Sequence, residues 1–183
     1  MNIIVYLLLT FMFLYSLMII YFIIGNLLKS KISTTDSLIP ISIIIAIRNG
    51  ENSLPNLISY LSKQDYLGDL EFILVDDESK DSTKSLILNK SKKDTRFIYE
   101  SSKNGDSSLK YKKKALDAGI KKAKNEWMLF TDVDCKLDTS WASSMAKYFS
   151  EDADYIIGYS ETTPGKTLVS KFQSIDFFML ILG

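Results

Sequence analysis

The sequence predicts an α/β protein with a mostly parallel sheet, flanking helices and one preceding N-terminal transmembrane helix. Apolar runs of strand length alternate with stretches of helical periodicity from residue 40 onward, as in a parallel sheet covered by helices on both faces. Several of these runs are almost unbroken, which is typical of strands buried on both sides. Residues 3–28 contain no charged side chain, which predicts the transmembrane helix.

The uncharged N-terminal run is long enough to span a bilayer. Its 26 residues would extend about 39 Å as a helix, more than the roughly 30 Å hydrocarbon core. A cleaved signal peptide is disfavoured because the run is long and lacks a basic start and a small-residue cleavage site. We expect a membrane anchor over residues 1–28 and a polar linker over 29–39.

Positive charge is found only on the C-terminal side of the predicted anchor. Lys29 and Lys31 follow it, and nothing basic precedes it. The positive-inside tendency therefore predicts a single N-terminal pass through the cell (inner) membrane, with the rest of the chain in the cytoplasm.

Composition restricts the chemistry of any site. The chain has one cysteine, Cys135, and no histidine. An internal disulfide is excluded, and so are zinc sites built from cysteine and histidine. Any metal must be held by oxygen, which favours Mg²⁺ or Mn²⁺. The formal net charge of zero gives no argument for a nucleic-acid partner, and we expect none.

Hydrophobic patterning predicts the first elements after the linker. A β-branched run over 41–47 indicates a strand buried on both faces. Apolar residues at helical spacing predict a helix over 54–61. A second apolar run predicts a strand over 70–75, followed by a helix over 82–89 with Asp81 as its N-cap.

The same reasoning predicts the later elements. A short strand is expected over 97–99, and small and apolar residues on one face predict a helix over 112–123. A fourth strand is expected over 127–131 and a helix over 139–149. A last strand is expected over 155–159.

Polar side chains follow three of the predicted strands. Arg48 follows the first, Asp77 the second, and Asp132 and Asp134 the fourth. In parallel sheets, ligands bind outside the carboxyl ends of the strands, where the strand order reverses. Hard oxygen ligands at that edge suit a divalent cation and a diphosphate. If strand geometry persisted through residue 134, both carboxylates of the D-x-D sequence would project together.

The D-x-D spacing alone is weak evidence, because it occurs twice. Asp152 and Asp154 repeat it after an amphipathic stretch, where it is typical of a solvated turn. Only the first copy follows a predicted strand. Position in the fold, not the motif, distinguishes the two.

Four segments then identify a resemblance. Residues 41–51, 71–83, 112–119 and 131–141 resemble, in order and spacing, those of family 2 glycosyltransferases. The resemblance implies a GT-A (Rossmann-like) fold and a nucleotide-sugar-binding domain over 40–165. It also implies sugar transfer of the hexosyltransferase type from a nucleotide-diphosphate sugar, with UDP-sugars favoured. The acceptor would be a lipid or a glycan, the reaction metal-assisted and the anomeric centre inverted.

The resemblance also implies roles for individual residues. Those expected at the donor are Ala46, Arg48 and Glu51 against the base and ribose, Asp77 at the uracil or ribose, Lys112 near the donor, and Asp132 on the sugar nucleotide. Asp134, together with Asp132, is expected to hold the metal that bridges the diphosphate.

The chain departs from the family pattern at several positions. The family usually has Pro at position 46, Glu at 50, Gly at 111 and Asn at 117. Tyr111 matters most, because a bulky residue replaces a flexible one beside Lys112. No acidic pair matching the family's general base follows Asp134. We therefore expect a truncated chain that binds donor but transfers sugar poorly.

Residues 166–183 are expected to form an apolar helix that starts a missing C-terminal part. Its apolar residues recur at helical spacing, which fits a helix in a soluble core or one lying on the membrane surface.

Other functions remain open from the sequence. A nucleotidyltransferase is one, although the loop after the first strand has a single glycine, Gly50. A membrane-tethered, receiver-like regulatory domain with an acidic pocket at Asp76 and Asp77 is another. A donor-binding but inactive fragment is the third.

Overall fold

A four-stranded sheet forms the centre of residues 34–154. The computed structural model describes residues 2–27, 38–149, 154–158, 160, 167 and 169–171. Contacts divide the chain into this unit and a second one made of residues 1–33 and 155–183. The two units are described separately.

The sheet is parallel throughout, as predicted. Its strands are β1 (Ile41–Ile47), β2 (Leu70–Asp76), β3 (Phe97–Ser101) and β4 (Trp127–Phe130), in the order β3-β2-β1-β4. The chain builds the sheet in one direction from β1 to β3 and then places β4 on the free side of β1. The strand order therefore reverses between β1 and β4, where α/β proteins usually bind their ligands.

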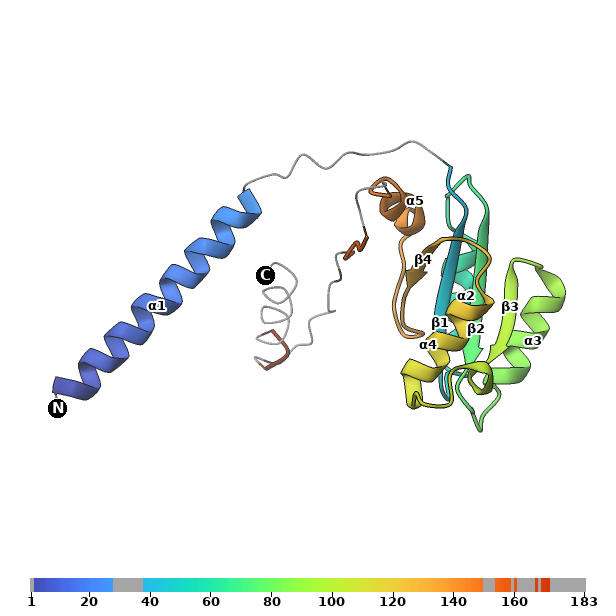
Figure 1. Cartoon of the computed structure of the whole chain (residues 1–183), viewed down its shortest axis with the longest axis horizontal. Coiled ribbons are helices and arrows are strands. Elements are labelled where there is room, and N and C mark those ends of the chain that lie inside the picture. Colours follow the sequence, from blue (N-terminus) through green and yellow to red (C-terminus); the bar gives the residue numbers. More distant parts are fainter. Residues whose placement is uncertain are drawn as a thin grey trace. The chain divides into compact units, whose positions relative to one another are not determined.

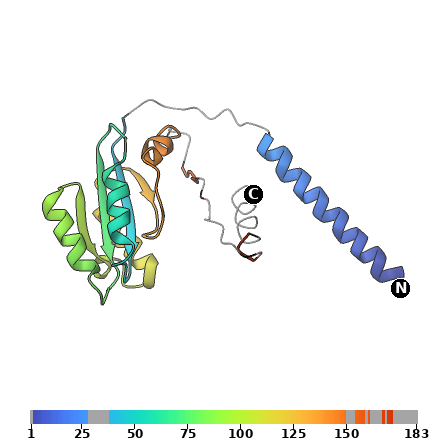
Figure 2. The ribbon, with the colours of Figure 1, turned by 180° about the vertical axis from the view of Figure 1, so that it is seen from behind.

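Helices cover both faces of the sheet. They are α2 (Leu54–Ser62), α3 (Thr83–Lys93), the 3-10 turn η1 (Ser102–Asn104), α4 (Tyr111–Lys122) and α5 (Trp141–Ala146). Helix α4 lies on the near face in Figure 1. Helices α2 and α3 lie on the opposite face, which is nearer in Figure 2.

Alternation along β1 accounts for the two-sided core. Ile44 packs with Ile73 and Val75 against the small residues of α4. The alternate side chains, such as Ile43 and Ile45, point to the face covered by α2 and α3 and are fully buried. The strand predicted to be buried on both faces is therefore confirmed.

Gly119 allows α4 to approach the sheet closely. A Cβ atom at this position would lie 2.4 Å from Cγ2 of Ile44 and 3.1 Å from Cγ2 of Val75. Any larger residue would push the helix away from β1 and β2. This contact fixes the position of α4 along the two strands.

Polar contacts at the amino-terminal edge of the sheet fix the direction of α4. The hydroxyl of Ser42 donates to Oε1 of Glu71 at 2.5 Å. That same Oε1 accepts from the backbone N–H of Lys124 at 2.8 Å, and Ser42 Oγ accepts from that of Asn125 at 3.2 Å. The connection after α4 therefore lies at the amino-terminal edge, and the first turn of α4 lies at the carboxyl edge.

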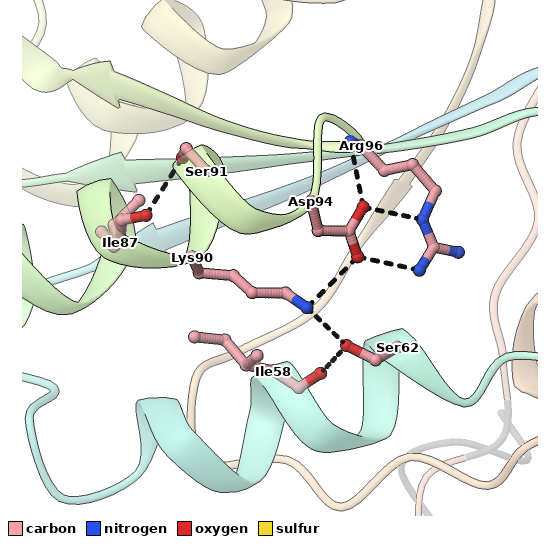
Figure 3. A network of polar contacts seen from close by, with 7 residues as sticks. All are labelled: Ile58, Ser62, Ile87, Lys90, Ser91, Asp94 and Arg96. Atoms are coloured by element: carbon pink, nitrogen blue, oxygen red, sulfur yellow. Dashed lines mark hydrogen bonds and ion pairs between the residues drawn. The ribbon is translucent and has the colours of Figure 1, made fainter.

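A charged network joins the C-terminal ends of α2 and α3 to the start of β3 (Figure 3). Asp94 accepts hydrogen bonds from the Arg96 guanidinium at 2.9 and 3.1 Å, and its Oδ2 lies 3.2 Å from Nζ of Lys90. Lys90 also donates to Ser62 Oγ. The Arg96 hydrogen bonds outweigh partial desolvation and hold the pKa of Asp94 well below its ordinary value. The network lies away from the carboxyl edge, so its role is structural.

Most predicted boundaries agree with the structure, and three predictions are wrong. Helix α3 continues to Lys93 rather than ending near residue 89. Helix α5 ends at Ala146 rather than near residue 149. Residues 155–158 form no strand, because β-propensity does not form a strand without a paired neighbour. Residue 159 and most of the apolar segment 166–183 lie outside the described residues.

The second unit contains the helix α1 (Asn2–Leu27). Its stretch Ile3–Gly25 has a mean hydropathy of 2.6 and is long and apolar enough to cross a membrane. The hydroxyls of Thr10 and Ser16 donate to the carbonyls of Tyr6 and Met12, at 2.8 and 2.9 Å. These polar groups are thus satisfied within the helix, as a membrane-spanning segment requires.

Candidate functional site

The loops that follow β1 and β2 are joined by a ladder of hydrogen bonds. The backbone N–H of Asn49 donates to Ser79 Oγ, and Asn49 Oδ1 accepts from the N–H of Lys80, both at 2.9 Å. The N–H of Gly50 donates to Oγ1 of the fully buried Thr83 at 2.8 Å. Asn49 itself has a left-handed backbone, with φ of 52°, which asparagine tolerates well. The two loops form one fixed rim at the carboxyl edge.

Glu51 and Asp81 extend the ladder. Asp81 accepts from the N–H of Glu51 at 3.1 Å, and Glu51 Oε2 accepts from the N–H of Ser82 at the same distance. Desolvation raises the pKa of Asp81, but hydrogen bonds from Thr83 and Glu51 outweigh it, and the pKa lies below its ordinary value. One oxygen of Glu51, predicted at the donor, thus holds the two loops together. Asp81 also caps the start of α3 through the N–H of Thr83, although the helix cap position is Ser82.

The two aspartates at the end of β2 have different roles. Asp76 is buried and accepts from the N–H of Ser79 at 3.1 Å, which fixes the turn. Asp77 lies 3.8 Å from the Arg48 guanidinium, and its own N–H donates to the carbonyl of Ile47 at 2.8 Å. The Asp77 side chain is 13% exposed and that of Arg48 is 54% exposed. A mostly buried carboxylate and a more accessible cation therefore lie side by side at the ends of β1 and β2.

Gly50 brings the loop after β1 against the loop after β4. A Cβ on Gly50 would lie 2.6 Å from Cγ2 of Ile47 and 3.3 Å from Cγ2 of Val133. Val133 is the middle residue of the D-x-D sequence. The two loops therefore meet on the side of β1 where the strand order reverses.

Strand geometry does not persist through the D-x-D sequence. Strand β4 ends at Phe130, and residues 133 and 134 form a turn that is closed by a 3.3 Å bond from the N–H of Cys135 to the carbonyl of Asp132. The two carboxylates consequently meet different neighbours. Asp132 forms an ion pair with Lys112 of α4. Asp134 lines a pocket on the side of α2. The condition under which both would project together from a strand is therefore not met.

The pocket beside Asp134 is open and polar, with a volume of about 130 Å³. The stretch before α2 and the first turns of that helix form one wall, and the turn after β4 forms the other. Its polar lining includes Asn52, Asn56 and Asp134. The sequence reasoning missed both asparagines: Asn52 lies in the turn before α2 and Asn56 in the first turn of that helix.

The first turn of α4 brings two side chains to the carboxyl edge. Lys112 and Asp132 are paired but more than half exposed, at 57% and 54%. Tyr111 precedes the lysine with a left-handed backbone, φ of 54°, and is 76% exposed. The conformation at position 111 is one that glycine adopts freely and tyrosine does not.

The structure thus gathers most of the predicted site residues at one edge. Arg48, Asp77, Lys112, Asp132 and Asp134 all lie at or just beyond the carboxyl ends of the strands. Ala46, in contrast, packs against the core cluster beneath α4, so its side chain belongs to the core. Among the residues that the structure describes, no three acidic, cysteine or histidine side chains are grouped closely enough to hold a metal by themselves.

Comparisons with known proteins agree with this geometry. The sequence model of Glycosyl transferase family 2 matches residues 42–178. A β-1,3-glucosyltransferase from Campylobacter jejuni, named for GalNAc(5)-diNAcBac-PP-undecaprenol, is 30% identical over 121 residues, covering 64% of this chain and 37% of that protein. The chain therefore spans well under half the length of this relative.

Two solved structures are among those similar to the chain. Mannosyltransferase PcManGT from Pyrobaculum calidifontis, in complex with GDP-Man and Mn²⁺, matches with a TM-score of 0.61 and 19% identity, covering 73% of this chain and 40% of that one. S. aureus TarS in complex with UDP matches with a TM-score of 0.45 and 26% identity, covering 59% of this chain and 31% of the other.

The family match covers far more than half of the chain and includes all four strands of the sheet. It favours a glycosyltransferase over a nucleotidyltransferase or a receiver-like domain. The fold is of the GT-A type, as predicted, and the chain belongs to glycosyltransferase family 2.

Proposed function

We propose that the carboxyl edge of this sheet binds a nucleotide-diphosphate sugar and serves the transfer of its sugar to an acceptor. One observation carries the proposal. Acidic residues from the ends of β2 and β4, each beside a cation from another element, gather next to the point where the strand order reverses. Family membership gives this arrangement its chemistry.

The nucleoside would lie at the ends of β1 and β2. The backbone of Asp77 is held by its N–H bond to Ile47, and its mostly buried carboxylate would accept from N–H or hydroxyl groups of a base or ribose. Arg48 supplies donors on the solvent side. We assign Glu51 the role of fixing this rim, and Ala46 contributes its backbone and the core beneath it.

The diphosphate would lie between the loop after β4 and the first turn of α4. Mg²⁺ and Mn²⁺ are commonly held by one or two carboxylates together with substrate phosphate oxygens, so a site without a third protein carboxylate fits this use. We propose Asp134 as the principal ligand, and Asp132, which faces Lys112 rather than the pocket that Asp134 lines, as the second. When bound, the metal would supply charge neutralisation for the leaving diphosphate. Lys112, now paired with Asp132, would turn its ammonium toward the same phosphates.

The family resemblance and the named relative guide the choice of donor and acceptor. We propose UDP-sugars as the first donors to test, because the family resemblance implies a uracil or ribose contact at Asp77, with GDP-sugars as the alternative. We propose hexosyl transfer with inversion to a lipid-linked or glycan acceptor. The name of the C. jejuni relative, which includes a polyprenyl-diphosphate-linked glycan, supports a lipid-linked one.

Membrane attachment completes the proposal. Helix α1 would anchor the chain, residues 29–39 would serve as the linker, and residues 40–165 would form the catalytic domain. Lys29 and Lys31 after the anchor support a cytoplasmic site at the cell membrane. A lipid-linked acceptor would then be held close to the site by the same bilayer.

Titration calorimetry of the full chain with UDP and with GDP, each with and without Mn²⁺, tests the proposal. We expect metal-dependent binding of at least one nucleotide, weakened at least ten-fold by Asp77→Asn, because the amide keeps the shape but loses the charge that pairs with Arg48. Asp69→Asn, an exposed change just before β2, is the matched control and should bind like the unchanged chain. Absence of binding to any nucleotide by the unchanged chain would contradict the proposal.

A further inference from the structure

Tyr111 has a backbone conformation that disfavours it. Its φ of 54° lies in the left-handed region, where residues other than glycine, asparagine and aspartate are strained and a bulky one is an outlier. Strain of this kind persists where the surroundings or a function require it. The strain at this position indicates that the tyrosine side chain has a role that a less strained residue would not fill.

The role of the Tyr111 ring is not packing within the domain. Tyr111 is 76% exposed, so most of its ring faces solvent rather than the core. The neighbouring residues that hold α4 on the sheet are the small ones, Ala115, Ala118 and Gly119. A glycine at position 111 would relieve the strain and leave these contacts unchanged. The ring therefore adds little to the stability of the fold.

The position of the ring follows from the contacts of α4. Gly119 lies on Ile44 and Val75, and Tyr111 precedes it by eight residues, about 12 Å along the helix axis. The helix runs antiparallel to the strands, and β1 extends only about 10 Å from Ile44 to its end at Ile47. The first turn of α4 is thus level with the ends of β1 and β2, where Arg48 and Asp77 are found.

We propose that the ring of Tyr111 is a stacking platform for the nucleoside of the donor. This inference rests on the proposed function and adds a specific contact to it. Aromatic side chains bind nucleobases through their π faces, and an exposed ring at a ligand edge is available for this contact. The left-handed backbone directs the ring outward at the start of α4, while Lys112, the next residue, faces Asp132. Strain at position 111 is then retained for binding rather than for folding.

Three substitutions at position 111 distinguish the effect of the aromatic ring from the effect of the backbone strain. Tyr111→Phe keeps both and should bind UDP and UDP-glucose, or GDP and GDP-mannose, as the unchanged chain does. Tyr111→Ala removes the ring and keeps the strain, and should weaken binding of the nucleotide and of the nucleotide sugar alike, about ten-fold. Tyr111→Gly should weaken binding equally but raise the melting temperature, because it removes both ring and strain.

A matched control addresses the strain alone. Glu78 has the same φ of 54°, is well exposed and lies in the loop after β2. Glu78→Gly should raise the melting temperature as Tyr111→Gly does, with nucleotide binding retained.

Nucleotide binding is measured by titration calorimetry with Mn²⁺ present. The melting temperature is measured by thermal denaturation of the full chain in detergent. If the unchanged chain binds nucleotide and Tyr111→Ala binds equally well, the platform is overturned while the proposed function stands. A loss confined to the nucleotide sugar, with UDP or GDP unaffected, would overturn the nucleoside contact. If the unchanged chain binds neither nucleotide, the proposed function itself fails, and this inference with it.

Discussion

The ammonium group of Lys112, in the first turn of α4, forms an ion pair with the carboxylate of Asp132, two residues after the end of β4. The pair joins the first turn of α4 to the loop after β4, across a separation of 20 residues in the sequence. It places a cation beside the D-x-D sequence at the edge of the sheet where the strand order reverses. We expect loss of the Lys112–Asp132 pair to weaken donor binding more than it destabilises the fold.

Replacing Lys112 by Met tests that expectation. Both partners are more than half exposed, so the pair contributes at most about 1 kcal/mol to the free energy of unfolding. We expect Lys112→Met to change the melting temperature little and to weaken Mn²⁺-dependent nucleotide binding about ten-fold or more, because a charge-assisted phosphate contact is lost. Lys113→Met, one residue further along the exposed side of α4, is the control. Equal binding by both variants would show that Lys112 has no special role.

The hydroxyl of Thr83 should matter for both stability and binding. It is fully buried and accepts from the N–H of Gly50, so Thr83→Val leaves a buried donor without a partner at a cost of about 1–3 kcal/mol. Loss of this bond also loosens the rim that holds Arg48. We expect a lower urea midpoint and weaker nucleotide binding in Thr83→Val. Thr83→Ser keeps the hydroxyl and should retain nearly all of the binding. If Val and Ser at this position behave alike, the ladder of hydrogen bonds does not position the site.

The network around Asp94 should stabilise the fold without affecting binding. The pKa of Asp94 is lower in the folded state than in the unfolded chain, so its contribution is present above the unfolded pKa, near 4, and is lost as the pH falls toward the folded value. We expect Asp94→Asn to lower the free energy of unfolding by about 1–2 kcal/mol at pH 7, with the difference shrinking below about pH 4.

Urea denaturation at several pH values measures the effect of Asp94→Asn, with Asp69→Asn as the exposed control. A pH-independent difference would show that the charge of Asp94 is not its source. A change in nucleotide binding would contradict the structural role assigned to the network.

Much of the fold was predictable because its signals are local. The unbroken run over 41–47 and the helical spacing of Leu54, Leu57 and Leu61 each reflect burial that the structure confirms. The run over 155–159 has similar propensity, but residues 155–158 do not pair with a strand. A strand depends on its partner, which propensity does not reveal.

The gathering of the candidate site residues at one edge was predictable, but their individual contacts were not. Arg48, Asp77 and Asp132 were expected at strand ends, and parallel topology brings such ends to one edge. The different directions of Asp132 and Asp134 were not predictable, because the turn at residues 133 and 134 depends on contacts between loops, such as that of Gly50 with Val133. Pairing of Lys112 with Asp132 likewise depends on how α4 packs, which Gly119 determines.

The metal dependence of nucleotide binding by Asp134→Ala tests the central claim most directly. Asp154 closes the other D-x-D sequence and is exposed, so Asp154→Ala is the matched control. Calorimetric titration with UDP and with GDP would be done in Mn²⁺ and after its removal with EDTA. The account predicts that Asp134→Ala binds in Mn²⁺ no better than the unchanged chain binds in EDTA, whereas Asp154→Ala keeps the full response to metal. Undiminished Mn²⁺-dependent binding by Asp134→Ala would contradict the account.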